Sequence, residues 1–250
     1  PGSGGAFAWA QLNSLPADGY TLMGINLPHI FLQPMSGDVG YRTEDIAPVY
    51  LFQATPHALV VTAGSPIASL EDFIRVARER PGGVTVAGTG LHTANHVAQQ
   101  LFDRAAGIAT RYVALTGTGA TMEALLGKHV DAMWNFTTAG VELKGKVRLL
   151  AVAMGERHPL FPDVPTFDEK GIALRGGAER GVAVPKGVPA AIRARLSELF
   201  AAINHDPAYR KAMIDGGYVP IDIDHAALPV YMATCTEQFL GVADILGLRR

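Results

Sequence analysis

A turn rich in glycine and threonine, residues 88–96, contains the residue types that are best suited to bind a ligand. It reads Gly-Thr-Gly-Leu-His-Thr-Ala-Asn-His and stands between an apolar run that predicts a strand and a periodic run that predicts a helix. Its small residues let a ligand approach the backbone, the hydroxyls of Thr89 and Thr93 can donate hydrogen bonds, and unpaired amides at a helix start favour an anion. The segment predicts binding of a carboxylate or phosphate. The structural alternative is that the glycines only make the turn and Thr93 only caps the helix.

A second turn of the same kind, residues 115–120, contains Thr116, Gly117 and Gly119 and also stands between a predicted strand and a predicted helix. In open α/β sheets ligands gather beyond the carboxyl ends of the strands, so successive turns of this kind can face one crevice. Neither turn matches Gly-x-Gly-x-x-Gly, because the third glycine is absent. A dinucleotide site is therefore not predicted.

Two other patterns do not support a cofactor, a metal or catalysis. Residues 140–147 fit Gly-x-x-x-x-Gly-Lys, but Val147 stands where a P-loop needs Ser or Thr, and the segment precedes a strand. His92 and His96 are four residues apart, yet Thr93 occupies the Glu position of His-Glu-x-x-His and no third ligand stands nearby. A packed or ligand-facing His96 fits better than a metal ligand. No Gly-x-Ser-x-Gly elbow is present, so no catalytic residue is predicted.

Aromatic residues flank a polar one at the end of a later apolar run. Trp134 and Phe136 flank Asn135, whose amide could form hydrogen bonds with a polar ligand. The aromatic rings could line a cleft, but packing in the core explains them equally well. Near the start of the chain, Phe7 and Trp9 are expected to be core contacts of a first helix.

The elements that must position these residues alternate between short apolar runs and longer amphipathic ones. This alternation predicts βαβ units and a parallel sheet covered on both faces. Three helices are predicted after a polar stretch at 171–180, and Ser69 is expected to start an earlier helix with Asp72 three residues on. The predicted strands are 20–24, 84–87, 111–113, 130–135, 147–153 and 181–185, and the predicted helices include 70–80, 95–106, 120–126 and 190–203.

The composition excludes several classes of protein. With 250 residues, 48% of them hydrophobic, the chain can form a substantial core, and its net charge of -2 offers no basic field for nucleic acid. Cys235 is the only cysteine, so neither a disulfide within the chain nor a thiolate zinc site is possible. No run approaches the length of a membrane span, and the start of the sequence lacks the regions of a signal peptide.

Taken in order, several short segments resemble the Bug or TctC family, the substrate-binding proteins of tripartite tricarboxylate transporters. Each segment alone is weak, but the ordered set is specific and spans nearly the whole chain. Beyond the turn at 88–96, the segments are Pro-Gly-Ser-Gly-Gly at 1–5, Asp-Gly-Tyr-Thr-Leu at 18–22, Ala-Pro-Val at 47–49, Val-Asp-Ala-Met at 130–133, Gly-Lys-Val-Arg at 145–148, Phe-Pro-Asp-Val-Pro-Thr at 161–166 and Arg-Gly-Val-Ala-Val-Pro at 180–185.

The resemblance implies a two-lobed α/β periplasmic binding protein of the type II, Venus-flytrap class, with a ligand cleft between lobes and a hinge crossed twice. It also implies that backbone amides and ordered water hold a ligand carboxylate. The family's cleft-facing positions map near 26–29, 88–93, 116–119 and 135–137. Together with His96, the candidate ligand-binding residues are Asn26, His29, Gly88, Thr89, Gly90, Thr93, Thr116, Gly117, Gly119, Asn135 and Thr137.

Three departures from the family pattern stand out. Residues 115–117 replace a Tyr-Lys-Gly-like sequence, and Asn135 replaces an aspartate, which indicates a ligand without a cationic amine. Family members also have a strand, a glycine-rich turn and a helix before the Pro-Gly-x-Gly-Gly segment. Either this sequence is part of a longer chain that carries these elements, or the chain is a truncated or rearranged relative whose first lobe lacks them. Their loss would expose apolar neighbours and unpaired backbone groups.

The sequence thus predicts lobe 1 from 1–62 plus 179–250 and lobe 2 from 63–178. The expected function is a monomeric extracytoplasmic receptor that captures a small carboxylate, such as a di- or tricarboxylate or an aromatic acid, for the membrane permease subunits of a tripartite tricarboxylate transporter. No cofactor, nucleic-acid partner or stable membrane insertion is expected. The alternatives are a sensor of the same fold that signals to a regulatory partner and, less favoured, a small-molecule enzyme that uses His92 or His96 as an acid or base.

Overall fold

The computed structural model of the chain describes residues 3–248, so Pro1 and Gly2 of the segment 1–5 lie outside the described residues. Within this range the chain divides into two compact units. The first comprises residues 3–54, 178–214 and 219–248, and the second comprises residues 55–177 and 215–218. The first boundary therefore lies earlier along the chain than the predicted 62/63, and residues 215–218 belong with the second unit rather than with the first lobe.

The sheet of the first unit has its strands in the order β1, β7, β2 and β8. These strands are β1 (Met23–Leu27), β7 (Gly177–Val184), β2 (Ala47–Thr62) and β8 (Val219–Ile223). β1 runs antiparallel to β7, and the first half of β2 runs antiparallel to β8. The second half of β2 continues into the other unit.

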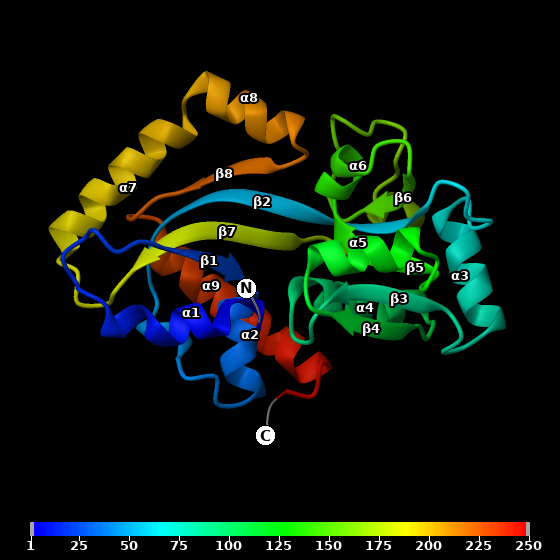
Figure 1. Cartoon of the computed structure of the whole chain (residues 1–250), viewed down its shortest axis with the longest axis horizontal. Helices are drawn as coiled ribbons and strands as arrows, with labels where there is room; N and C mark the ends of the chain where they lie inside the picture. The colour runs from blue at the N-terminus through cyan, green and yellow to red at the C-terminus, as the bar shows by residue number, and fades with distance from the viewer. Residues whose placement is uncertain (1–2, 249–250) are drawn as a thin grey trace. The chain divides into compact units, whose positions relative to one another are not determined.

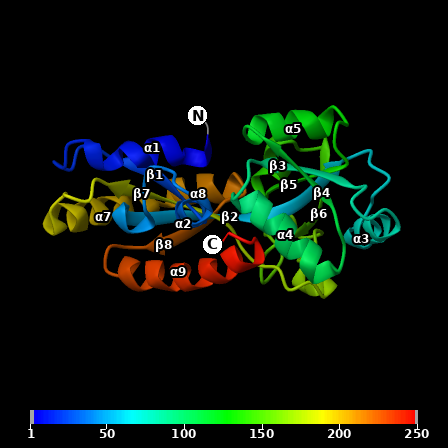
Figure 2. The same cartoon turned by 90° about the horizontal axis from the view of Figure 1, so that it is seen from below.

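Helices cover both faces of this first sheet. Figure 2 shows α1 on one face and α9 on the other. Trp9 of α1 and Phe31 of α2 are buried in the core with Ile25 and Leu51 from the strands. Phe7 is 70% exposed, so its predicted core role is wrong, because it lies on the solvent side of a helix that buries only Ala6 and Trp9. The helices are α1 (Ala6–Gln11), α2 (His29–Ser36), α7 (Ala190–Asn204), α8 (Pro207–Asp215) and α9 (Leu228–Ile245), with short 3-10 turns at Ser3–Gly5, Leu12–Ser14 and Thr43–Asp45.

The sheet of the second unit contains the three parallel strands that the sequence predicted (Figure 1). β3 lies between β4 and β5 and runs parallel to both, while β2 runs antiparallel to β5 and β6. The strands other than β2 are β3 (Thr85–Thr89), β4 (Arg111–Leu115), β5 (Ala132–Phe136) and β6 (Val147–Val152). All five residues of β5 are buried, as expected for a strand covered on both faces.

Helices α4 and α5 lie on opposite sides of these parallel strands (Figure 2). Phe73, Phe102, Trp134 and Phe167 fill the core on one side of the sheet. Ser69 caps α3 as predicted, since its Oγ accepts a hydrogen bond from the amide of Asp72 at 3.1 Å. The helices of this unit are α3 (Leu70–Glu79), α4 (Ala94–Ala106), α5 (Thr118–Leu126) and α6 (Thr138–Glu142), with a 3-10 turn at Asp168–Lys170.

The predicted strand at 20–24 is shifted, because the strand begins only at Met23. The Asp18 carboxylate accepts a hydrogen bond from the amide of Tyr20 at 3.0 Å, and this local turn leaves Tyr20 92% exposed. The apolar run therefore starts in a turn and enters the sheet late. None of the helices within residues 3–248 has the length and apolar character that crossing a membrane would require.

Candidate functional site

The second unit brings the ends of three neighbouring parallel strands to one edge of its sheet. Thr89, at the end of β3, lies opposite Leu115, at the end of β4, and β5 pairs with the other side of β3. The amide of Gly90 donates to the carbonyl oxygen of Leu115 at 2.9 Å, which joins the turn after β3 directly to the turn after β4. The two predicted turns are therefore neighbours, as the parallel arrangement implied.

The turn after β3 uses its own hydroxyl groups internally. Thr93 Oγ1 donates to the carbonyl oxygen of Thr89 at 2.5 Å, and Thr89 Oγ1 donates to Oδ1 of Asn95 at 2.6 Å. Gly90 and His92 both have positive φ, at 61° and 56°, so the chain reverses tightly between the two threonines. The expectation that these hydroxyls donate to a ligand is not supported, because each proton already has an acceptor in the turn.

Backbone amides remain as donors at the starts of α4 and α5. Within residues 3–248, no side chain caps α4, which begins after Thr93, or α5, which begins after Gly117. The first amides of an α-helix have no acceptor within the helix, and the helix dipole places partial positive charge there. Gly119, in the first turn of α5, has open space around its Cα. Two uncapped helix starts at adjacent strand ends have the donor chemistry that suits an anion.

One buried side-chain donor lies beside these amides. Asn95, the second residue of α4, is buried, and its Nδ2 has no hydrogen-bond partner among the described residues. Buried amide groups in folded proteins nearly always have a partner, so an unpaired one needs an explanation. A ligand acceptor at the helix start would provide that partner. Asn95 was not selected from the sequence, although it lies in the segment 88–96, directly before His96.

The Tyr112 side chain explains why residue 88 is a glycine. Tyr112 was not selected from the sequence as a site residue, because it lies within a predicted strand. Its hydroxyl donates to the carbonyl oxygen of Gly90 at 3.1 Å. A Cβ on Gly88 would come within 2.2 Å of that hydroxyl oxygen. Gly88 therefore makes room for the Tyr112 ring, which holds the turn, and its role in letting a ligand approach the backbone stays a prediction.

His96 packs against the Tyr112 ring, with 4.9 Å between ring centroids. Its Nδ1 accepts a hydrogen bond from the amide of His92 at 3.3 Å, so a neutral ring carries its proton on Nε2. Burial, and the positive charge of a protonated His92, lower the pKa of His96 to about 4. At neutral pH His96 is thus an uncharged donor rather than a cation. Within the described residues, no cluster of three or more His, Cys, Asp or Glu is placed to hold a metal ion.

Because the Thr93 hydroxyl bonds within the turn, we expect its removal to lower the stability of the chain rather than to remove a direct ligand contact. Replacing Thr93 with Val leaves the carbonyl oxygen of Thr89 without its donor, and we expect the free energy of unfolding to fall by about 1–2 kcal/mol. Urea denaturation followed by circular dichroism measures this change. Thr118→Val is the matched control, since the Thr118 side chain is exposed at the start of α5. Equal midpoints for the two variants would show that the Thr93 hydroxyl does not hold the turn.

The end of β5 is built differently from the other two strand ends. Asn135 is buried, with its Oδ1 accepting from the amide of Phe136 at 2.8 Å and its Nδ2 donating to the Met133 sulfur at 3.6 Å. Thr137 is also buried, and its Oγ1 donates to the carbonyl oxygen of Gly217 at 2.6 Å. Thr137 thus fastens the short segment 215–218 to the second unit. These contacts show structural roles for both residues.

Asn26 and His29 belong to the first unit. Asn26 is half-buried on β1, opposite Arg180 of β7. His29 is the first residue of α2, is buried, and has no hydrogen-bond partner for Nδ1 among the described residues. Burial and the nearby Arg180 guanidinium lower the pKa of His29 to about 4. Asn135 and Thr137 lie at the end of the neighbouring strand β5, whereas Asn26 and His29 belong to the first unit. The other predicted residues belong to the two joined turns and the helices that follow them: Gly88, Thr89, Gly90, Thr93, His96, Thr116, Gly117 and Gly119.

Comparisons with known proteins show the family of the chain. The family model described as "Tripartite tricarboxylate transporter family receptor", TctC, matches residues 1–237. A Cupriavidus necator protein named UPF0065 protein in the gbd 5' region is 27% identical over 252 residues, which cover 100% of this chain and 77% of that protein. Two further curated relatives are covered over 60% and 66% of their own length.

Solved structures share the fold. The periplasmic binding protein BugD superposes with a TM-score of 0.89 at 24% identity, covering 99% of this chain and 85% of BugD. The structure of Rpa4515 from R. palustris with adipate superposes with a TM-score of 0.90 at 25% identity, covering 97% of this chain and 83% of that protein. The α/β fold of this chain is therefore that of the periplasmic binding proteins.

Proposed function

The chain belongs to TctC, the receptor family of tripartite tricarboxylate transporters, and from this premise we propose that it binds a small dicarboxylate at the uncapped starts of α4 and α5. The observation that carries the proposal is the junction of the two turns, where the amide of Gly90 donates to the carbonyl oxygen of Leu115. This junction sets two groups of unpaired amides side by side. Each group suits a carboxylate oxygen, and the Nδ2 of Asn95 adds a further donor.

The proposed chemical class of the ligand rests on the amide donors of the site and on the ligand named for a similar protein. Uncharged amide donors hold a carboxylate without a fixed cation, and the neutral His96 adds no positive charge. The ligand of Rpa4515, adipate, is a linear dicarboxylate. The family resemblance implies an aspartate at the position of Asn135, and the buried Asn135 offers no carboxylate that would pair with a ligand amine. We therefore propose an organic acid that lacks an amino group.

We also propose the compartment in which the chain works and the partner that receives its ligand. BugD is named as a periplasmic binding protein, and the family is named for transporter receptors. We infer that this chain works in the periplasm and delivers its ligand to membrane permease subunits. Binding and release, with no covalent step, are sufficient for that role. The ligand cleft that the family resemblance implies between two lobes stays a prediction.

A substitution in the first turn of α5 tests the proposed site with two opposite effects. Gly119→Asp places a carboxylate among the unpaired amides, where it should stabilise the helix by about 0.3–1 kcal/mol through the helix dipole. The same carboxylate should weaken dicarboxylate binding tenfold or more, because two like charges about 4 Å apart repel by about 1–4 kcal/mol between aqueous and protein-like dielectric. Gly119→Asn is the matched control, since it adds nearly the same volume without charge.

Calorimetric titration with adipate, malate, citrate and benzoate, and with aspartate for the amine, measures these affinities. We expect at least one acid without an amine to bind the wild type and the Asn variant with similar affinity, and to bind the Asp variant tenfold more weakly. Equal affinity for the Asp and Asn variants would place the ligand elsewhere. A preference for aspartate over the other acids would contradict the inference drawn from Asn135.

A further inference from the structure

The first unit contains a large cavity that the proposed dicarboxylate site does not use. Its volume is about 670 Å³, and every residue that lines it belongs to the first unit. Side chains of α2 and α9, including Phe31, Met35, Leu228 and Met232, form an apolar floor. Cavities of this size and character are typical of small-molecule sites.

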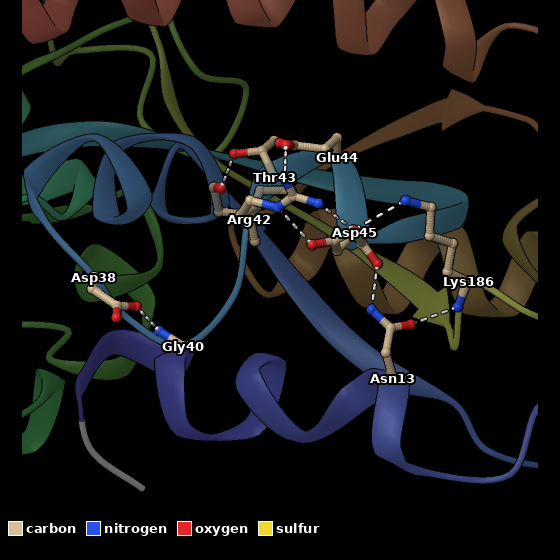
Figure 3. A network of polar contacts seen from close by, with 9 residues as sticks. Asn13, Asp38, Gly40, Arg42, Thr43, Glu44, Asp45 and Lys186 are labelled. Carbon is tan, nitrogen blue, oxygen red and sulfur yellow. Dashed lines mark hydrogen bonds and ion pairs between the residues drawn. The ribbon is translucent and has the colours of Figure 1, made fainter.

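The polar rim of the cavity is already neutralised by its own ion pairs (Figure 3). Asp45 accepts from Arg42 Nε and from Lys186 Nζ, each at 3.0 Å, and Glu44 pairs with Arg42 at 3.4 Å. Asn13 holds this group in place, because its Nδ2 donates to the carbonyl oxygen of Asp45 at 2.8 Å and its Oδ1 accepts from the amide of Lys186 at 2.7 Å. Two carboxylates therefore balance the two cations of the rim.

Arg193 is the cation that lacks such a partner. It lines the cavity from α7, and its Nε is buried with no hydrogen-bond partner among the described residues. Among residues 3–248, no carboxylate lies within ion-pairing distance of Arg193. The Arg193 side chain as a whole is only partly buried, but buried N–H donors in folded proteins nearly always have an acceptor, so its Nε needs one. The cavity thus combines an apolar floor with one uncompensated positive charge.

We propose that this cavity is a second ligand site, for a small amphipathic monocarboxylate whose aliphatic or aromatic body lies on the apolar floor and whose carboxylate pairs with Arg193. The ligand class differs from that of the proposed transport site, since a second carboxylate would have to be buried against Phe31 and Met232. An apolar body is expected to tighten binding about fourfold for each added methylene that is fully buried.

The test uses octanoate as the probe, with hexanoate and decanoate to measure the dependence on chain length. Calorimetric titration should show affinity that rises from hexanoate to octanoate, and octylamine should not bind. Arg193→Gln should weaken octanoate binding about tenfold or more, because it removes a charged hydrogen bond. Arg195→Gln is the matched control, since Arg195 lies on the same helix, is exposed and pairs with Glu198 outside the cavity.

A second variant keeps the charge and fills the space. Ala233 lines the cavity but is exposed, so Ala233→Trp should obstruct octanoate without disturbing the buried core, and an unchanged melting temperature verifies the fold. The proposal is wrong if octanoate does not bind, or if both Arg193→Gln and Ala233→Trp bind it as the wild type does. It is also wrong if sedimentation shows a dimer that Ala233→Trp dissociates, because the cavity is then an interface between copies of the chain.

The two proposals fail independently. Gly119→Asp should leave octanoate affinity unchanged, and Arg193→Gln should leave adipate affinity unchanged, because the residues concerned belong to different units. Loss of octanoate binding in the Gly119→Asp variant would show that octanoate uses the proposed dicarboxylate site and would overturn the second site alone.

Discussion

The Gly177→Ala variant should lose about 3 kcal/mol of stability, at the upper end of what overpacking costs. A Cβ at this position would lie 2.1 Å from the carbonyl oxygen of Thr55 and 2.9 Å from the Cα of Pro56. Both neighbours are backbone atoms, so no side-chain rotation can relieve the overlap. The close approach is fixed further by the amide of His57, which donates to the carbonyl oxygen of Gly176 at 3.0 Å.

This position matters because the chain passes between its two units at 54/55 and again at 177/178. Thr55 and Gly177 are thus the first and last residues of the long segment of the second unit, and they touch each other. An alanine here would separate β2 from β7 at the point where β2 enters the second unit and β7 leaves it. We expect the loss of stability to be accompanied by weaker adipate binding only to the extent that the second unit unfolds.

Urea denaturation monitored by circular dichroism measures the effect, and Gly24→Ala is the matched control. Gly24 is also a strand glycine, but nothing lies within 4 Å of a Cβ at its position. Replacing a glycine in such an open position should be neutral or stabilise the chain slightly, because alanine loses less conformational entropy on folding. If Gly177→Ala unfolded at the same urea concentration as Gly24→Ala, the close contact with Thr55 would not be a constraint in solution.

The arrangement of the candidate site was predictable from the sequence because parallel strands impose it. Once 84–87 and 111–113 are interpreted as neighbouring parallel strands, the turns that follow them must lie at the same sheet edge. The amide of Gly90 bonded to the carbonyl oxygen of Leu115 is the result. The direction of the hydroxyls of Thr89 and Thr93 was not predictable, because it depends on the position of carbonyl groups and of Asn95 within the folded turn.

The roles of residues that pack across the sheet could not be predicted from the sequence either. Tyr112 belongs to a strand, and only the register of β4 against β3, with Gly88 opposite Ala114, brings its ring over Gly88. β2 was not predicted as a strand at all. Its sixteen residues pass from one unit to the other and lie in two different environments, so their burial lacks the simple alternation of a half-buried strand.

His29 should make the stability of the chain depend on pH. Burial, and to a lesser extent Arg180, lower the pKa of His29 to about 4 from an ordinary value of 6.5. Below pH 6.5 the imidazole of His29 therefore binds a proton in the unfolded chain but stays neutral in the folded chain. The stability from the neutral ring is fully present above pH 6.5 and is lost progressively as pH falls toward 4.

The size of this effect follows from the difference between the two pKa values. At about 1.4 kcal/mol for each pKa unit, it amounts to about 3 kcal/mol by pH 4. His29→Gln removes the titration and keeps an uncharged polar side chain, so its stability should fall less than that of the wild type over this range. Other groups, including His96, titrate in both proteins and cancel in the comparison.

Urea midpoints measured at intervals between pH 7.5 and 4 give the two curves, with the intervals set by the roughly one-unit breadth of a single titration. We expect the wild-type and His29→Gln curves to be parallel above pH 6.5 and to converge below it, since only the wild type must protonate a buried imidazole on unfolding. His129→Gln, which replaces an exposed histidine, should follow the wild type throughout. Curves for wild type and His29→Gln that stay parallel down to pH 4 would mean that water or an anion reaches His29 Nδ1, which has no partner within the described part of the chain.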